Sequence, residues 1–180
     1  MATVPTPLDW VANTGVFVTA ALLQAGVRDP LAFLADQPRC QAYQNTPQSI
    51  TTATNTSLTW DTEDYDNDGM HSLVSNTSRF TAVTAGRYVV SAQAAFTANA
   101  TGIREIRILK NGTTTPNGGR ATQPANSAAI TTTVQISNYL IPMIVGDYIE
   151  IQVNQTSGAA LSMVATNGLY SYLHMYRVCA

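Results

Sequence analysis

The chain has 180 residues, of which 45% are hydrophobic and only 11% are charged, and its formal net charge is −2. This length suits one well-cored domain with an appendage and excludes two domains of ordinary size. The low net charge, without a cluster of Lys and Arg, argues against nucleic acid as a partner.

The N-terminal residues Met1–Pro5 lack a basic segment, and no apolar run approaches the roughly 18–20 residues that cross a membrane. We therefore expect a protein that is synthesised in the cytoplasm and has no membrane partner.

Residues 1–38 are richer in large apolar side chains than the rest of the chain. Ala20–Ala25 favours a short helix that Gly26 ends, and Asp29-Pro30 is typical of an N-cap before a second short helix, Leu31–Ala35. Two such helices cannot bury these side chains against each other, so the segment packs on its own head or on another protein. Its candidate contact residues are Trp10, Phe17, Leu22, Leu23, Leu31, Phe33 and Leu34.

From Cys40 onward the hydrophobic pattern has a period of two, which predicts strands. Apolar residues alternate over 88–96, 130–140 and 148–153. Asn111-Gly112 is typical of a type I′ hairpin turn, and residues 113–128 are predicted to form a long loop. Many short strands with such turns, in a chain rich in threonine, predict an all-β sandwich or jelly roll.

The last predicted strand, Leu169–Val178, is apolar on both sides. Leu173 and Met175 point to one side, and the other side carries Tyr170, Tyr172, His174 and Tyr176. One face of such a strand belongs in the core, and the other must be covered by something else. A neighbouring subunit would cover it.

Four stretches in this order resemble the C1q/TNF-like superfamily. The best is Phe80, five residues, Gly86, any residue and Tyr88; the others are 64–71, 146–153 and 170–173. The resemblance implies an all-β, ten-stranded jelly-roll head over residues 39–180 that forms homotrimers. It also implies that the first and last strands are neighbours, which would allow a disulfide between Cys40 and Cys179.

The N-terminal segment carries a second resemblance, through Trp10, Gly15, Val18–Leu23, Arg28–Leu34 and Pro38. It is similar to a module that opens many short structural proteins of tailed phages and attaches them to the particle. The resemblance implies that residues 1–38 are a short helical and extended virion-anchoring arm.

Asp64, Asp66 and Asp68, followed by Gly69, have the spacing of a calcium loop. Ser75 stands at the twelfth position, where a bidentate acid is expected, so a polar loop with Asx-turns is the alternative. Calcium is the only cofactor that the sequence suggests. Neither His71 nor His174 lies in a nucleophile motif, and no catalytic residue is predicted.

These features favour a non-enzymatic bacteriophage structural protein on the virion surface, most simply a trimeric capsid decoration or minor capsid protein. Its partners would be two further copies of itself and the major capsid or tail protein. The alternative is a tail-associated receptor-binding or host-adhesion protein that binds cell-wall glycans. A cell-envelope hydrolase is a weaker third class, because no acid/base pair is evident.

Overall fold

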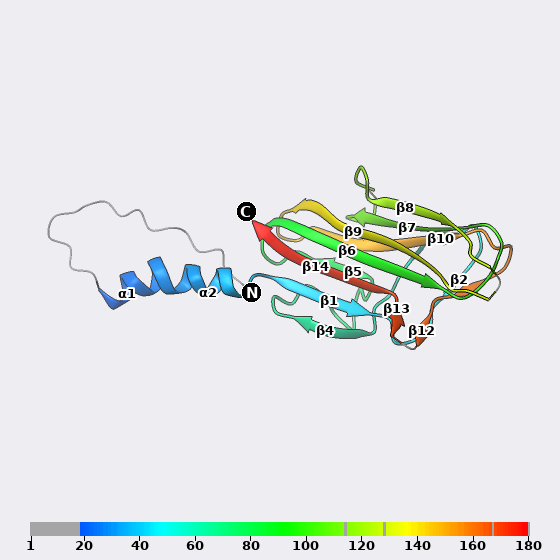
Figure 1. Cartoon of the computed structure of the whole chain (residues 1–180). Coiled ribbons are helices and arrows are strands. Elements are labelled where there is room, and N and C mark those ends of the chain that lie inside the picture. Colours follow the sequence, from blue (N-terminus) through cyan, green and yellow to red (C-terminus); the bar gives the residue numbers. More distant parts are fainter. Residues whose placement is uncertain (1–18, 114, 128, 167, 180) are drawn as a thin grey trace.

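The protein is described from a computed structural model over residues 19–113, 115–127, 129–166 and 168–179, and it forms two stacked antiparallel sheets (Figure 1). The first sheet has the strand order β4 (Thr62–Asp66), β1 (Arg39–Tyr43), β14 (Tyr172–Cys179), β6 (Gly86–Phe96) and β9 (Thr132–Met143). The second has the order β3 (Thr56–Ser57), β10 (Tyr148–Gln155), β7 (Ile103–Lys110) and β8 (Arg120–Pro124), with β5 (Arg79–Thr81) also paired to β10. Two short pairs complete the head: β2 (Ser49–Ile50) with β11 (Leu161–Ser162), and β12 (Ala165–Thr166) with β13 (Leu169–Tyr170).

The core lies between the two sheets and is built from the predicted alternation. On β6 the inward residues Tyr88, Val90 and Phe96 have no exposed surface, and on β14 Leu173 and Met175 are equally buried. They face Ile149 and Ile151 and their neighbours from the second sheet across the sandwich. The alternation predicted for residues 88–96 and 148–153 is confirmed, and it fixes which side chains each strand turns outward.

Strand β9 departs from the predicted alternation. Asn138 has a φ of 54° and sits at a break in the β6–β9 register, so the strand changes phase there. Leu140, predicted to share a face with Ile136, is 47% exposed, while Ile141 and Met143 are buried. Ile130 lies outside the strand and is 57% exposed.

The long loop predicted for residues 113–128 is partly wrong, because β8 pairs with β7 within it. Asn111 and Gly112 do have positive φ values, 52° and 73°, as a type I′ turn requires. The β7–β8 pairing reaches only to Arg107 and Arg120, however, so the turn at Asn111-Gly112 does not join the two strands directly. Asn111 instead hydrogen-bonds to Tyr148 at the start of β10.

The N-terminal segment is one helical run instead of two helices: α1 (Ala20–Leu23), a π-helical turn (Gln24–Arg28) and α2 (Asp29–Ala35). Gly26 does not take a left-handed conformation and therefore does not end the helix. Pro30 cannot donate a backbone hydrogen bond, and the wider π turn just before it accommodates this break. In the part of the chain that the structure describes, no helix is long and apolar enough to cross a membrane.

This helix does not cover the head. It extends away from the sandwich at the end where β14 finishes, and none of its residues is buried (Figure 1). Of the predicted contact residues, Leu23, Leu31 and Leu34 are 48%, 59% and 63% exposed. Trp10 and Phe17 lie outside the described residues. The helix is therefore not a lid on its own head, and the lid alternative is wrong for this part of the segment.

The predicted neighbourhood of the first and last strands is confirmed, but the disulfide is not. β1 pairs with β14 in a register that sets Cys40 opposite Met175, while Cys179 lies opposite Arg87 on β6. Four residues along a strand separate Met175 from Cys179, a distance of about 13 Å. Both cysteines are free, Cys40 in the core and Cys179 exposed, so this register keeps the two thiols of one subunit apart.

Candidate functional site

The outer surface of the β4-β1-β14-β6-β9 sheet carries a cluster of aromatic side chains. Because Leu173 and Met175 point into the core, the alternating residues of β14 point outward, and the register places Gln41 beside His174 and Tyr43 beside Tyr172. The break between β13 and β14 at buried Ser171 leaves Tyr170 on the same surface. We call this surface the aromatic face; it comprises Tyr43, Tyr65, Tyr170, Tyr172, His174 and Tyr176.

The rings of the aromatic face pack on one another. Ring centroids lie 5.1 Å apart for Tyr43 and Tyr170, 6.1 Å for Tyr65 and His174, and 5.1 Å for His174 and Tyr176. Partial burial lowers the pKa of His174, which favours the neutral imidazole. The face is therefore mainly aromatic, with the Asp64 carboxylate at its β4 edge accepting a hydrogen bond from Gln41. Clustered aromatic rings are typical of the core of a protein interface.

Two grooves cross the aromatic face. One is lined by Tyr43, Tyr170 and Tyr172 together with Gln41 and Gln93. The other runs from Leu34 and Ala35 at the end of the helix to Tyr65, His174 and Tyr176. The structure thus brings the four predicted interface residues of the closing segment together and adds Tyr43 and Tyr65, which the sequence did not single out.

The outer surface of the other sheet has a different chemistry. Arg120 forms an ion pair with Glu105 at 2.5 Å, and Arg79 reaches Glu150 at 3.4 Å while its guanidinium lies 4.2 Å from the ring centroid of Tyr148. We call this surface the paired face, because its charged side chains find partners within the subunit. Such a surface is stable in contact with water.

The three aspartates of the predicted calcium loop do not converge on one point. Asp66 accepts hydrogen bonds from the backbone N–H groups of Asp68, Met70 and His71 at 3.3, 3.0 and 2.8 Å. Asp64 instead accepts from the Gln41 side chain, and Asp68 from the Thr84 hydroxyl. Among the described residues no group of three or more His, Cys, Asp or Glu side chains is placed to hold a metal. The three aspartates therefore correspond to the alternative, a polar loop with an Asx-turn at Asp66.

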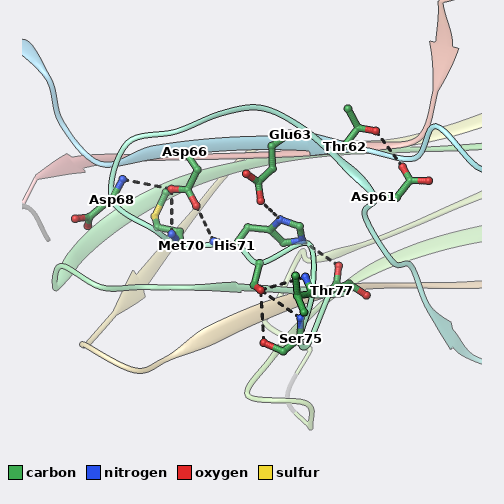
Figure 2. A network of polar contacts seen from close by, with 11 residues as sticks. Asp61, Thr62, Glu63, Asp66, Asp68, Met70, His71, Ser75 and Thr77 are labelled. Carbon is green, nitrogen blue, oxygen red and sulfur yellow. Dashed lines mark hydrogen bonds and ion pairs between the residues drawn. The ribbon is translucent and has the colours of Figure 1, made fainter.

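His71 lies within the same loop and contacts residues on both sides of it. Its side chain is fully buried, with Nδ1 2.6 Å from a Glu63 carboxylate oxygen and Nε2 3.1 Å from the Thr77 carbonyl (Figure 2). The ring stacks on Phe80 at a centroid distance of 5.1 Å. These contacts hold the chain on both sides of the tip 72–76, where Leu73 and Val74 are 48% and 94% exposed.

Asn67 joins the helix to the head, a role that no pattern in the sequence indicates. Its side-chain amide donates to Asp36 at 2.8 Å and to the Gln37 carbonyl at 3.0 Å, and its oxygen accepts from the Arg39 N–H at 2.7 Å. On β14, the Arg177 guanidinium lies 5.0 Å from the ring centroid of Phe33. Phe33, a predicted docking residue, therefore contacts its own head, and the direction of the helix is fixed at this joint.

Two sheets in this arrangement define a C1q/TNF-like jelly roll, and solved structures of such domains match the chain. The globular domain of the zebrafish complement 1qA protein has a TM-score of 0.57 and 12% identity, covering 79% of this chain and 98% of that one. Murine APRIL at pH 5.0 has a TM-score of 0.57 and 13% identity, covering 79% of this chain and 100% of that one. No family model and no curated protein matches the sequence. At these identities the likeness shows the fold, and the predicted jelly-roll head is confirmed.

Proposed function

We propose that the protein is a non-enzymatic structural protein that assembles into a homotrimer through the aromatic face. The observation that carries this proposal is the cluster of six partly exposed aromatic rings on one side of the sandwich. Aromatic residues are enriched at the centres of protein interfaces, where they contribute most of the binding energy. The grooves across the face are lined by these rings together with Asp64 in one and Arg39 and Arg177 in the other, so a second copy can meet them with both apolar and polar side chains.

We further propose that the trimer decorates a bacteriophage particle and that the arm, residues 1–38, attaches it there. The similarity of residues 10–38 to phage attachment segments supports this role. So does the helix, which extends away from one end of the head (Figure 1). Purified protein added to particles that lack it should bind through the arm. Particle binding that is undiminished after deletion of residues 1–38 would contradict this part of the proposal.

A matched pair of variants tests the trimer. Tyr172→Glu places a charge at the centre of the aromatic face, and Thr122→Glu places the same charge on β8, on the paired face. Both sites are partly or fully exposed in the subunit, so both variants should fold. Size-exclusion chromatography with light scattering should give a monomer for the first and a trimer for the second. Equal masses for both variants would contradict the assignment of the face.

A host-adhesion head is a second candidate, favoured by the tip 72–76. Val74 is 94% exposed on a base that buried His71 holds in place. Exposed apolar groups on a rigid loop suit recognition of another molecule. Purified trimer should then bind isolated host cell walls, and Val74→Ser should weaken that binding while particle attachment is unchanged. A decoration protein would show no binding to cell walls.

A further inference from the structure

The helix of residues 20–35 has an apolar stripe that the described part of its own chain leaves exposed. Leu23, Val27, Leu31 and Leu34 are 48%, 43%, 59% and 63% exposed. They are spaced by four, four and three residues, so three turns of about 3.67 residues return the stripe to the same side of the helix. The charged side chains of the run lie elsewhere, with Arg28 paired to Asp29 at 2.7 Å.

The stripe is continuous with the aromatic face. Leu34 and Ala35 line the same groove as Tyr65, His174 and Tyr176, so the end of the helix meets the aromatic rings in one continuous groove, whose lining also includes Arg39 and Arg177. The joint made by Asn67 holds the helix at that position through three hydrogen bonds. Any partner that covers the aromatic face symmetrically therefore brings its own copy of the helix to the same side.

We propose that the helices of three subunits pack on one another through this stripe and form a short helical neck that extends the trimer interface beyond the heads. This inference rests on the proposed trimer. The occupant is a second copy of the same stripe, because an interface on a symmetry axis places identical residues opposite each other. A helix of this length is only marginally stable by itself in water and gains stability from packing its apolar side.

In this neck, Leu23, Leu31 and Leu34 contact the helices of the other subunits. Direct contact with a particle is then left to the segment before Thr19, which contains Trp10 and Phe17.

Adjacent residues supply a matched pair of variants for the test. Leu31 lies on the stripe and Ala32 on the opposite side, and both are exposed in the subunit. Leu31→Glu and Ala32→Glu introduce the same charge into the same turn, so any general effect on the helix is shared. In the full-length protein, sedimentation equilibrium measures the concentration at which half of the trimers dissociate. It should rise about tenfold or more for Leu31→Glu and change little for Ala32→Glu.

A crosslink gives an independent measurement. Val27→Cys in a Cys179→Ser background should form a disulfide between two subunits under mild oxidation, because identical stripe positions face each other in the neck. Ala25→Cys in the same background should not. Trimers that show neither the Leu31→Glu effect nor the crosslink would overturn the neck and leave the proposed trimer standing. A wild-type protein that is monomeric would overturn the proposed trimer itself.

Discussion

The two outer surfaces of the sandwich differ in how far one subunit satisfies them. On the paired face Glu105 and Glu150 each contact an arginine, and Arg107 donates to Gln152 at 2.8 Å. On the aromatic face Tyr172, His174 and Tyr176 are half-buried rings, and His174 stacks on Tyr176. The first surface is complete in water, whereas the second leaves apolar rings exposed. This difference supports the proposal that a partner of the head meets the aromatic face.

The largest effect is expected from removing two rings of the aromatic face together. Tyr172→Ala with Tyr176→Ala should raise the dissociation constant of the trimer about a hundredfold or more, since interface tyrosines often contribute about 2 kcal/mol each. Sedimentation equilibrium at several concentrations measures it. Circular dichroism should show the sheet of the released subunit intact, and a trimer as tight as the wild type would remove the distinction between the two faces.

A smaller effect is expected at the edge of the aromatic face, where β4 ends in the loop after Asp66. Asp66→Ala leaves three backbone N–H groups without their acceptor and should destabilise the subunit by about 2–3 kcal/mol. Chemical denaturation measures this loss. Calcium should not change the unfolding midpoint of the wild-type protein, because the three aspartates bind different partners; a calcium-dependent rise would restore the calcium loop.

On the paired face the expected effects are smaller still. Glu105→Gln removes the carboxylate that forms the ion pair with Arg120, whose side chain is 59% exposed. The change should lower the free energy of unfolding of the subunit by about 1 kcal/mol or less. The trimer dissociation constant should stay at the wild-type value. A variant that instead dissociates the trimer would place this surface in the interface and reverse the comparison.

The last effect depends on pH and concerns Asp147 at the end of the paired face. Although burial opposes it, hydrogen bonds from Lys110, Asn111 and the Ile144 backbone lower the pKa of Asp147 to about 2. The ionised carboxylate therefore adds stability above the ordinary aspartate pKa of 3.8, and this stability is lost as the pH falls toward about 2. Asp147→Asn should be less stable than the wild type at neutral pH, with the difference shrinking on acidification. Thermal unfolding across this range measures it, and a constant difference would contradict the lowered pKa.

The fold could be predicted where one period describes a whole strand. Every second residue from Tyr88 to Phe96 is buried, as predicted, and both the inward and the outward residues of β14 follow from the positions of Leu173 and Met175. The part of the aromatic face that lies on β14 could therefore be predicted from the sequence. Tyr43 and Tyr65 were not predicted, because they reach the aromatic face only through the β1–β14 and β1–β4 pairings. These pairings join residues that are 19 or more positions apart in the sequence.

The remaining errors have local causes that a single-sequence pattern does not contain. The left-handed Asn138 shifts the phase of β9, so an unbroken alternation predicted the wrong side for Leu140. The helix continues past Gly26 because the π turn accommodates Pro30. The three aspartates matched a spacing, but the direction of each side chain is set by its own hydrogen-bond partner. Asn67 carries no pattern at all, because its role depends on contacts with Asp36 and Arg39.

The central claim is that three copies of the chain meet through the aromatic face. Sedimentation equilibrium of the wild-type, full-length protein at micromolar concentration tests it most directly. A trimer gives a single species with the mass of three chains. A single species with the mass of one chain would contradict it.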